Sequence, residues 1–167
     1  VPVTGDGVID LDALDEMLTA AGDPQVVALM LANNETGVLQ PVGEAAAIAH
    51  RHGAMLHCDA VQAVGKIPVD FAALGSDTMA LTGHKFGGPQ GVGALIVRTP
   101  DSIKCLMRGG GQEQGLRGGT ESVAHIVALG VAAEIATDRI DSYAALGELR
   151  DRMEARLLQA TPGMRVF

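Results

Sequence analysis

The feature that most constrains the fold is a short apolar run, Val26 to Ala32, in which apolar and polar residues do not alternate. A run of this length is far too short to span a bilayer. Its lack of alternation is typical of a strand that is buried on both faces of a sheet. Strands of that kind occur in folds where helices cover both faces of a mostly parallel sheet. The run therefore predicts an α/β protein.

Other short apolar segments extend this pattern along the chain. Asp10 can cap a helix that carries Leu11, Leu14 and Leu18 on one face. The fourth expected strand can pair with the third through the Gly-rich connection between them. The expected strands lie at 26–32, 54–58, 78–81 and 92–97, with helices at 10–22 and 42–52 (ended by Gly53) and two more that carry Val123 to Ala133 and Leu146 to Leu157.

This alternation of strands and helices predicts a three-layer αβα fold with a mostly parallel sheet. The final segment, 162–167, is interpreted as the entry into another strand. Because the chain begins without an initiator Met, we expect it to be a piece of a longer protein.

Composition excludes several classes of function. The 167 residues are 47% hydrophobic and 19% charged, an ordinary globular balance. A net charge of −8, with Lys and Arg totalling 12 and forming no basic run, argues against nucleic acid as a direct partner. No stretch suits a membrane span or a secretory signal. The cysteines, Cys58 and Cys105, are too few for a disulfide or zinc framework, so a reduced cytoplasmic compartment fits best.

Polar groups follow three of the expected strands. They are the segment 33–35, Asp59 with Gln62, and the segment 82–85. Each has an ordinary explanation when taken singly: an Asn-rich loop is usually a turn, a strand-end Asp is often a helix cap, and most lysines are solvated. However, ligands in open α/β sheets bind outside the carboxyl ends of the strands. Placement on three successive strand ends therefore favours one shared site.

The chemistry that needs such a set is that of pyridoxal 5'-phosphate (PLP). A lysine must hold the cofactor aldehyde, a carboxylate must face the ring nitrogen, and small donors must cradle the phosphate. The candidates are Lys85 for the amine, Asp59 for the carboxylate, Gln62 and Asn34 for the ring or substrate, and Thr82 and His84 for the phosphate.

Several segments resemble the cysteine desulfurases, members of the class V aminotransferase group with the type I PLP fold. These segments are 33–37 (NNETG), 57–66 (HCDAVQAVGK), 82–91 (TGHKFGGPQG), 109–113 (GGGQE) and 117–121 (RGGTE). The last two point to the branch that serves nitrogenase and iron–sulfur cluster assembly. The resemblance covers essentially the whole chain and implies the central portion of such a protein. It further implies that residues 1–140 belong to the PLP-binding large domain and that 141–167, a helix and a strand, lead into an incomplete small domain.

The resemblance implies a role for each candidate near the ring. Lys85 would be the Schiff-base lysine and proton shuttle. Asp59 would pair with the pyridinium nitrogen, and Gln62 would hydrogen-bond the ring hydroxyl. Asn34 would contact the ring hydroxyl or the substrate.

The phosphate ligands implied by the resemblance come from two subunits. Thr82 and His84 would bind the phosphate within their own subunit, and Thr120 would reach the phosphate of the neighbouring subunit in a homodimer. Thr120 also has an ordinary interpretation, as the N-cap of the helix from Val123 onward.

The activity implied is conversion of L-cysteine to L-alanine, with a persulfide on an enzyme cysteine and transfer of the sulfur to an acceptor or scaffold protein for iron–sulfur clusters or thiolation. Family members are more than twice as long, and their persulfide cysteine, substrate-binding arginine and ring-stacking histidine have no counterpart here. We interpret Cys58 as a core residue and Cys105 as ordinary packing. The chain alone is therefore expected to be inactive.

Two other interpretations remain open at this stage. One is a different class V PLP enzyme, such as a selenocysteine lyase or an aminotransferase. The other is an inactive scaffold or dimerisation fragment that keeps the motifs. A Rossmann-type nucleotide binder is disfavoured, because the glycine clusters do not form G-x-G-x-x-G between a strand and a helix.

Overall fold

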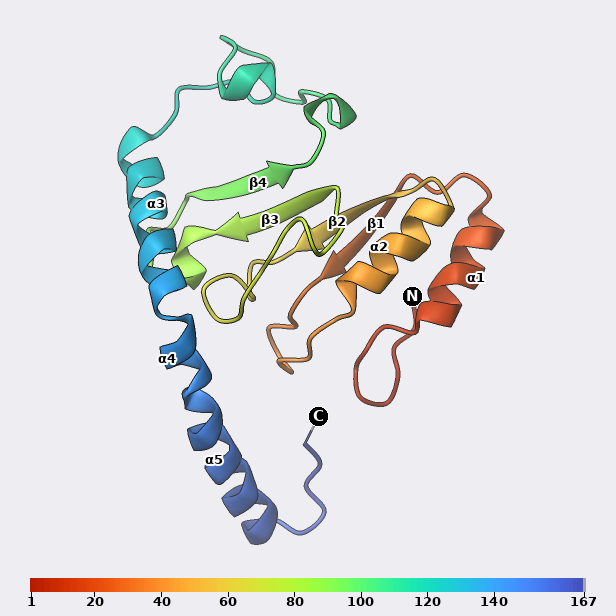
Figure 1. Ribbon diagram of the computed structural model, residues 1–167, viewed down its shortest axis with the longest axis vertical. Helices are drawn as coiled ribbons and strands as arrows, with labels where there is room; N and C mark the ends of the chain where they lie inside the picture. Colours follow the sequence, from red (N-terminus) through yellow and green to blue (C-terminus); the bar gives the residue numbers. More distant parts are fainter. Residues whose placement is uncertain (167) are drawn as a thin grey trace.

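The core of the protein is a four-stranded sheet in the order β1-β2-β3-β4, seen in a computed structural model that describes residues 1–166. Strands β1 (Val26–Met30), β2 (Met55–Asp59) and β3 (Thr78–Thr82) are parallel, and β4 (Gly93–Val97) is antiparallel to β3 (Figure 1). The mostly parallel sheet and the pairing of the fourth strand with the third were both predicted, and both are confirmed.

Two helices, α1 (Leu11–Ala21) and α2 (Val42–Arg51), pack over one face of this sheet (Figure 1). Asp10 begins α1 as predicted, because its Oδ1 accepts a hydrogen bond from the Ala13 N–H at 3.0 Å. Helix α2 buries Val42 and a row of alanines, and these small side chains let the helix lie close to β2. His52 is the C-cap of α2, and the expected Gly53 follows it with a φ of 75°.

The face of the sheet under α1 and α2 forms the hydrophobic core. The register aligns Leu29 with Cys58 and Cys58 with Met79, and Cys58 is fully buried. Residues that share a register position project from the same face. The core is therefore built from aliphatic side chains and one thiol, with Ile9, Leu14, Leu18, Val27, Leu56 and Met79 among its buried members.

The opposite face corrects the prediction that the first strand is buried on both sides. Val26 of β1 is 53% exposed, and Leu95 of β4 is 52% exposed. Helices α1 and α2 both lie on the core face of the sheet. An apolar strand can be buried on both faces only where a further element covers the second face, and in the described chain α1 and α2 do not cover it. The observed strand is also shorter than expected and ends at Met30.

A helical arm leaves the sheet after a long loop that contains η2 (Pro100–Ser102) and η3 (Glu113–Gly115). It consists of α3 (Val123–Asp138), α4 (Ile140–Ala144) and α5 (Leu146–Ala160), of which α4 was not predicted. Helix α3 packs on η1 (Gly83–Lys85), whereas α5 runs away from the sheet (Figure 1).

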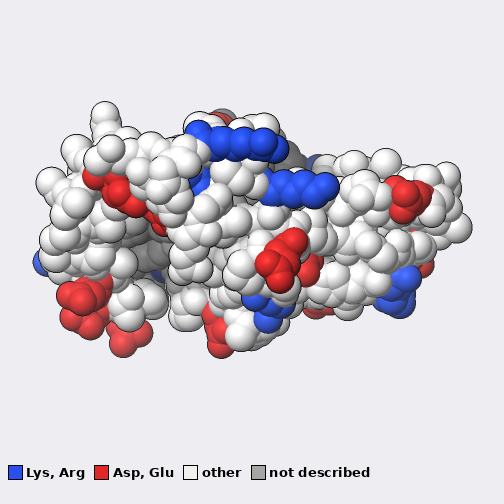
Figure 2. All heavy atoms as spheres, turned by 90° about the horizontal axis from the view of Figure 1, so that it is seen from above, with Lys and Arg blue, Asp and Glu red and all other residues white. Residues whose placement is uncertain are grey.

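The far end of the chain differs from its prediction. Residues 162–166 form no strand, and Phe167 lies outside the described residues. The segment touches the N-terminal region, where Arg165 Nη2 donates to the Gly5 carbonyl at 3.4 Å. Among residues 1–166, no helix is both long enough and apolar enough to cross a bilayer. On the face drawn in Figure 2, basic and acidic side chains are interspersed and form no basic stripe.

Asp77, which precedes β3, connects α2 to β2 through hydrogen bonds. Its Oδ2 accepts hydrogen bonds from the Leu56 N–H at 2.7 Å and from His50 Nε2 at 2.9 Å. Burial alone would raise the pKa of Asp77. The hydrogen bonds from His50 and Leu56, with the charge of Arg98, instead hold its pKa below the ordinary value.

We expect Asp77→Ala to lower the free energy of unfolding by about 2 kcal/mol, because the Leu56 N–H loses its acceptor. Since the folded-state pKa of Asp77 is lowered, its stabilisation is complete above the ordinary value of 3.8 and is lost as the pH falls below it. Urea denaturation at pH 7 and below pH 4 measures both effects. Asp101→Ala, which removes an exposed carboxylate, is the matched control and should change little. Equal stability of the Asp77 and Asp101 variants at neutral pH would contradict this assignment.

Candidate active site

The carboxyl ends of β1, β2 and β3 meet at one edge of the sheet because these strands are parallel. Met30 is aligned with Asp59, and Asp59 with Ala80. Thr82 lies two residues beyond Ala80 on the same strand, so it projects from the same face as Asp59. The sheet thus brings Asp59 and Thr82 to one edge and one face.

Asp59 has one carboxylate oxygen in use and one available. It is the last residue of β2, it is half-buried, and its Oδ1 accepts the Val61 N–H at 2.9 Å. Within residues 1–166, Oδ2 has no hydrogen-bond donor. The turn that follows carries Gln62, which is also half-buried and whose amide makes no hydrogen bond to the described part of the chain. Asp59 can therefore face a cationic ring nitrogen while its backbone contact keeps the carboxylate oriented.

Thr82 and His84 form a polar pair whose protons can be assigned. Thr82 Oγ1 donates to the Val92 carbonyl at 3.2 Å, and it lies 3.1 Å from His84 Nδ1. A hydroxyl has a single proton, so with that donation in place His84 Nδ1–H must donate to Thr82. The neutral imidazole then has no proton on Nε2. With this pairing intact, His84 donates to an anion from Nε2 only as the imidazolium.

Lys85 ends the short η1 helix directly after β3, and its side chain is exposed. Its backbone carbonyl accepts a hydrogen bond from Lys66 Nζ at 3.3 Å. Burial, and then the charge of Lys85, lower the pKa of Lys66. Lys66 is the last residue of the segment 57–66 (HCDAVQAVGK). Nothing in the sequence of that segment indicates that the Lys66 ammonium contacts the Lys85 backbone.

Gly65 lets the turn at residues 60–67 lie directly on η1 and α3. Its φ is +76°, and a Cβ there would lie 2.6 Å from Phe86 Cβ and 3.0 Å from Ala136 Cβ. A glycine is therefore required both by the backbone conformation and by the close approach. This contact fixes the turn that starts at Asp59 against the segment that carries Lys85.

The Asn33–Gly37 loop after β1 is held by Asn33 rather than by Asn34. Asn33 Oδ1 accepts the Glu35 N–H at 2.8 Å and the Thr36 N–H at 3.0 Å, whereas Asn34 is exposed and bonds Glu35 Oε1 at 2.6 Å. Gln40, which sequence reasoning missed, holds the N-terminal segment beside this loop. Its side-chain amide accepts the Ile9 N–H and donates to the Gly7 carbonyl, each at 2.8 Å.

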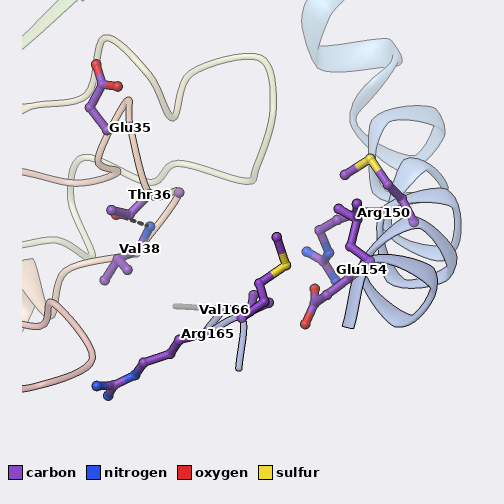
Figure 3. Close-up of a pocket in the computed structure, with 11 residues that line it drawn as sticks. Glu35, Thr36, Val38, Arg150, Glu154, Arg165 and Val166 are labelled. Atoms are coloured by element: carbon purple, nitrogen blue, oxygen red, sulfur yellow. Dashed lines mark hydrogen bonds between the residues drawn. The ribbon is translucent and has the colours of Figure 1, made fainter. Parts of the chain in front are cut away.

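A hollow lies beside this loop, and its lining does not include Asp59 or Lys85. It has a volume of about 600 Å³ and lies between residues 35–38, α5 and residues 164–166. Figure 3 shows Arg150 and Glu154 projecting from α5, across the hollow from Glu35. Its apolar lining of Val38, Met153, Leu157, Met164 and Val166 has the character of a packing surface between elements rather than of a catalytic cleft.

Thr120 is not brought to the strand-end site within one chain. It is exposed, in the segment between η3 and α3, which lies beyond β4 in Figure 1. The N-cap interpretation of Thr120 is wrong, because α3 begins at Val123 with Ser122 as its N-cap.

Neither cysteine has the surroundings of a nucleophile. Cys58 is fully buried, and burial together with the charge of Asp59 raises its pKa to about 11, so the thiol stays protonated at neutral pH. The interpretation of Cys58 as a core residue is confirmed. Cys105 is half-buried and donates from Sγ to the Met107 carbonyl at 3.1 Å. In the described part of the chain, no group of three or more His, Cys, Asp or Glu side chains could hold a metal ion.

Comparison with known proteins gives consistent results over the whole chain. The family model described as aminotransferase class-V matches residues 1–167. A cysteine desulfurase of Cereibacter sphaeroides is 47% identical, with 100% of this chain and 42% of that protein covered. One from Klebsiella pneumoniae is 44% identical with the same coverage. The X-ray structure of a NifS-like protein from Rickettsia africae matches with a TM-score of 0.90 at 38% identity, covering 97% of this chain and 45% of that one. The chain thus spans about two fifths of the length of these curated relatives.

The contact at Gly65 gives a test with a closely matched control. Gly65→Ala and Gly53→Ala place a side chain at nearly the same left-handed backbone angle, but the added Cβ at Gly53 meets no atom within 4 Å. We expect Gly65→Ala to cost about 2 kcal/mol more in unfolding free energy than Gly53→Ala, because only Gly65 is overpacked. Thermal and urea denaturation of the two variants measure the difference. Equal losses would show that the Gly65 contact is not tight.

Proposed function

Because this chain belongs to the class V aminotransferase family, we propose that it supplies the cofactor-holding part of a PLP enzyme that removes sulfur from L-cysteine. Its sheet and helices match the NifS-like structures, consistent with the predicted αβα fold, although α1 and α2 cover only one face of the sheet within this chain. The observation that carries the proposal is the joint placement of Asp59 and Lys85. Asp59 is the last residue of β2, and Lys85 lies in η1, directly after β3. Lys66, in the turn that follows Asp59, donates a hydrogen bond to the Lys85 carbonyl and so connects the two segments.

The side chains at this edge fit PLP by their chemistry. Asp59 offers an unused carboxylate oxygen, Gln62 offers an unbonded amide, and the exposed Lys85 offers a primary amine. To donate to a phosphate, the Thr82 hydroxyl would turn from the Val92 carbonyl toward the anion, and the imidazolium form of His84 would donate from Nε2. When bound, PLP would act as an electron sink for the charge that develops at the substrate Cα.

Each residue then has a definite task. Asp59 keeps a proton on the ring nitrogen, and Lys85 holds the cofactor and moves the proton at the substrate Cα. Gln62 hydrogen-bonds the ring hydroxyl. Asn34, on the loop after β1, contacts the ring hydroxyl or the substrate.

The remaining parts of the proposal concern the whole enzyme. A homodimer would let Thr120 of one subunit reach the phosphate held by the other, which is supported by the exposure of Thr120 and by its place in the segment between η3 and α3. Because Cys58 is buried and protonated and Cys105 directs its thiol to the Met107 carbonyl, the persulfide would form on a cysteine outside residues 1–167. The sulfur would pass to an acceptor or scaffold protein for iron–sulfur clusters or thiolation, in the cytoplasm. Residues 1–140 would belong to the large domain, and 141–167 would lead toward a small domain.

Lys85 can be identified directly as the residue that holds the cofactor. Borohydride reduction of the protein in the presence of PLP, followed by peptide mapping, is expected to place a pyridoxyl group on Lys85. Lys85→Ala should abolish both the adduct and the release of alanine from cysteine by the whole enzyme. Lys104→Ala, at an exposed lysine, should change neither. An adduct only on Lys66 or Lys104 would overturn the assignment.

Asp59 can be tested without disturbing its backbone contact. In Asp59→Asn the side-chain oxygen still accepts the Val61 N–H, but the neutral amide no longer stabilises a proton on the ring nitrogen. We expect alanine release to fall on the order of a hundredfold or more. The control is Asp70→Asn, since Asp70 also accepts backbone N–H groups, from Ala72 and Ala73, but lies outside the site. Turnover that falls equally in both variants would remove Asp59 from the site.

A further inference from the structure

We propose that a second hollow, beside η1, binds a small phosphate monoester whose charged head lies among Lys66, Arg139 and Tyr143. None of these three residues has a task in the proposed function, so the inference goes beyond it. The binding can be measured on the cofactor-free protein and does not depend on the desulfurase assignment.

The hollow lies between the turn at residues 60–67, the η1 segment and the junction of α3 with α4. Its volume is about 450 Å³, which suits a small ligand. Part of its lining is apolar and comes from Phe86, Ala132, Ile135 and Ala136. Gly65 packs against Phe86 and Ala136, so these walls are held in place. The ligand would therefore place a short apolar chain against one side of the hollow.

The charges that line the hollow are all positive. Lys66, Lys85 and Arg139 line it, and among the described residues no Asp or Glu does. None of the three cations forms an ion pair within residues 1–166. Asp138 and Asp141, which flank Arg139 along the chain, are exposed and lie outside the lining. The hollow therefore offers an anion an uncompensated positive field.

Several hydrogen-bond donors in the hollow are unused. The half-buried Lys66 gives one of its three ammonium protons to the Lys85 carbonyl at 3.3 Å. In the described part of the chain, the Arg139 guanidinium and the Tyr143 hydroxyl make no hydrogen bond. Burial, and then the charge of Lys85, lower the pKa of Lys66, so its ammonium form would be stabilised by a bound anion.

The charge balance selects the class of anion. A phosphate monoester carries a charge of about −1.5 to −2 near pH 7 and three acceptor oxygens. Lys66 and Arg139 supply two positive charges, and charge-assisted hydrogen bonds to phosphate are stronger than neutral ones. Once bound, the anion would connect the turn that carries Lys66 to the end of α3, where Arg139 is the C-cap.

Tyr143 makes the test specific to this hollow. It is the single tyrosine of the chain, which has no tryptophan, so the intrinsic fluorescence of the cofactor-free protein reports on Tyr143. We expect n-butyl phosphate to change this fluorescence in a saturable way, and to bind several-fold more tightly than inorganic phosphate because its alkyl chain is buried. Lys66→Gln and Arg139→Gln should each raise the Kd for butyl phosphate about tenfold.

The matched control is Arg152→Gln, which removes an exposed positive charge on α5 and should leave the Kd unchanged. Arg139 is exposed, so its variant keeps the test valid if Lys66→Gln does not fold. An unchanged Kd in Arg139→Gln would overturn the inference. A loss of affinity in Thr82→Ala instead would place the anion at the strand ends and would overturn it equally.

A last titration separates a free ligand from the phosphate of PLP. Calorimetry on protein that carries the pyridoxyl group after borohydride reduction should still detect butyl phosphate binding. Loss of binding there would mean that the hollow takes the phosphate of the cofactor, and the inference of a separate site would fail. If no pyridoxyl group forms on Lys85 but the Arg139 and Lys66 variants lose affinity, the proposed function fails while the anion site stands.

Discussion

The turn at residues 60–67 holds the two halves of the candidate site together, and its close packing depends on Gly65. The parallel register of β2 and β3 sets where Asp59 and Thr82 emerge, but it does not set where Lys85 lies, because Lys85 comes after the strand has ended. Gly65 lets the turn after Asp59 approach Phe86 until no Cβ would fit between them. The backbone segments that carry Asp59 and Lys85 are therefore held together by tertiary packing as well as by the sheet.

Much of the fold could be predicted because its signals are local. Asp10 caps α1 through its own side chain, and the apolar runs at β1 to β4 end at the polar residues Asn33, Asp59, Thr82 and Arg98. That Asp59 and Thr82 emerge at one edge of the sheet follows from the parallel order of the strands. What the sequence could not provide is contact between segments distant along the chain. The hydrogen bonds from Lys66 to Lys85 and from His50 to Asp77 join residues 19 and 27 positions apart, and no local pattern encodes them.

Apolar patterning was also an incomplete guide to burial. Helix α3 is apolar around its whole circumference, a pattern typical of a helix enclosed on all sides. Yet Val123 is 69% exposed and Val127 60% exposed, and in the described chain α3 packs mainly on η1. Val26 of β1 behaves in the same way. A pattern reports which surfaces a sequence can bury, whereas burial also requires a partner element, and the curated relatives are more than twice as long as this chain.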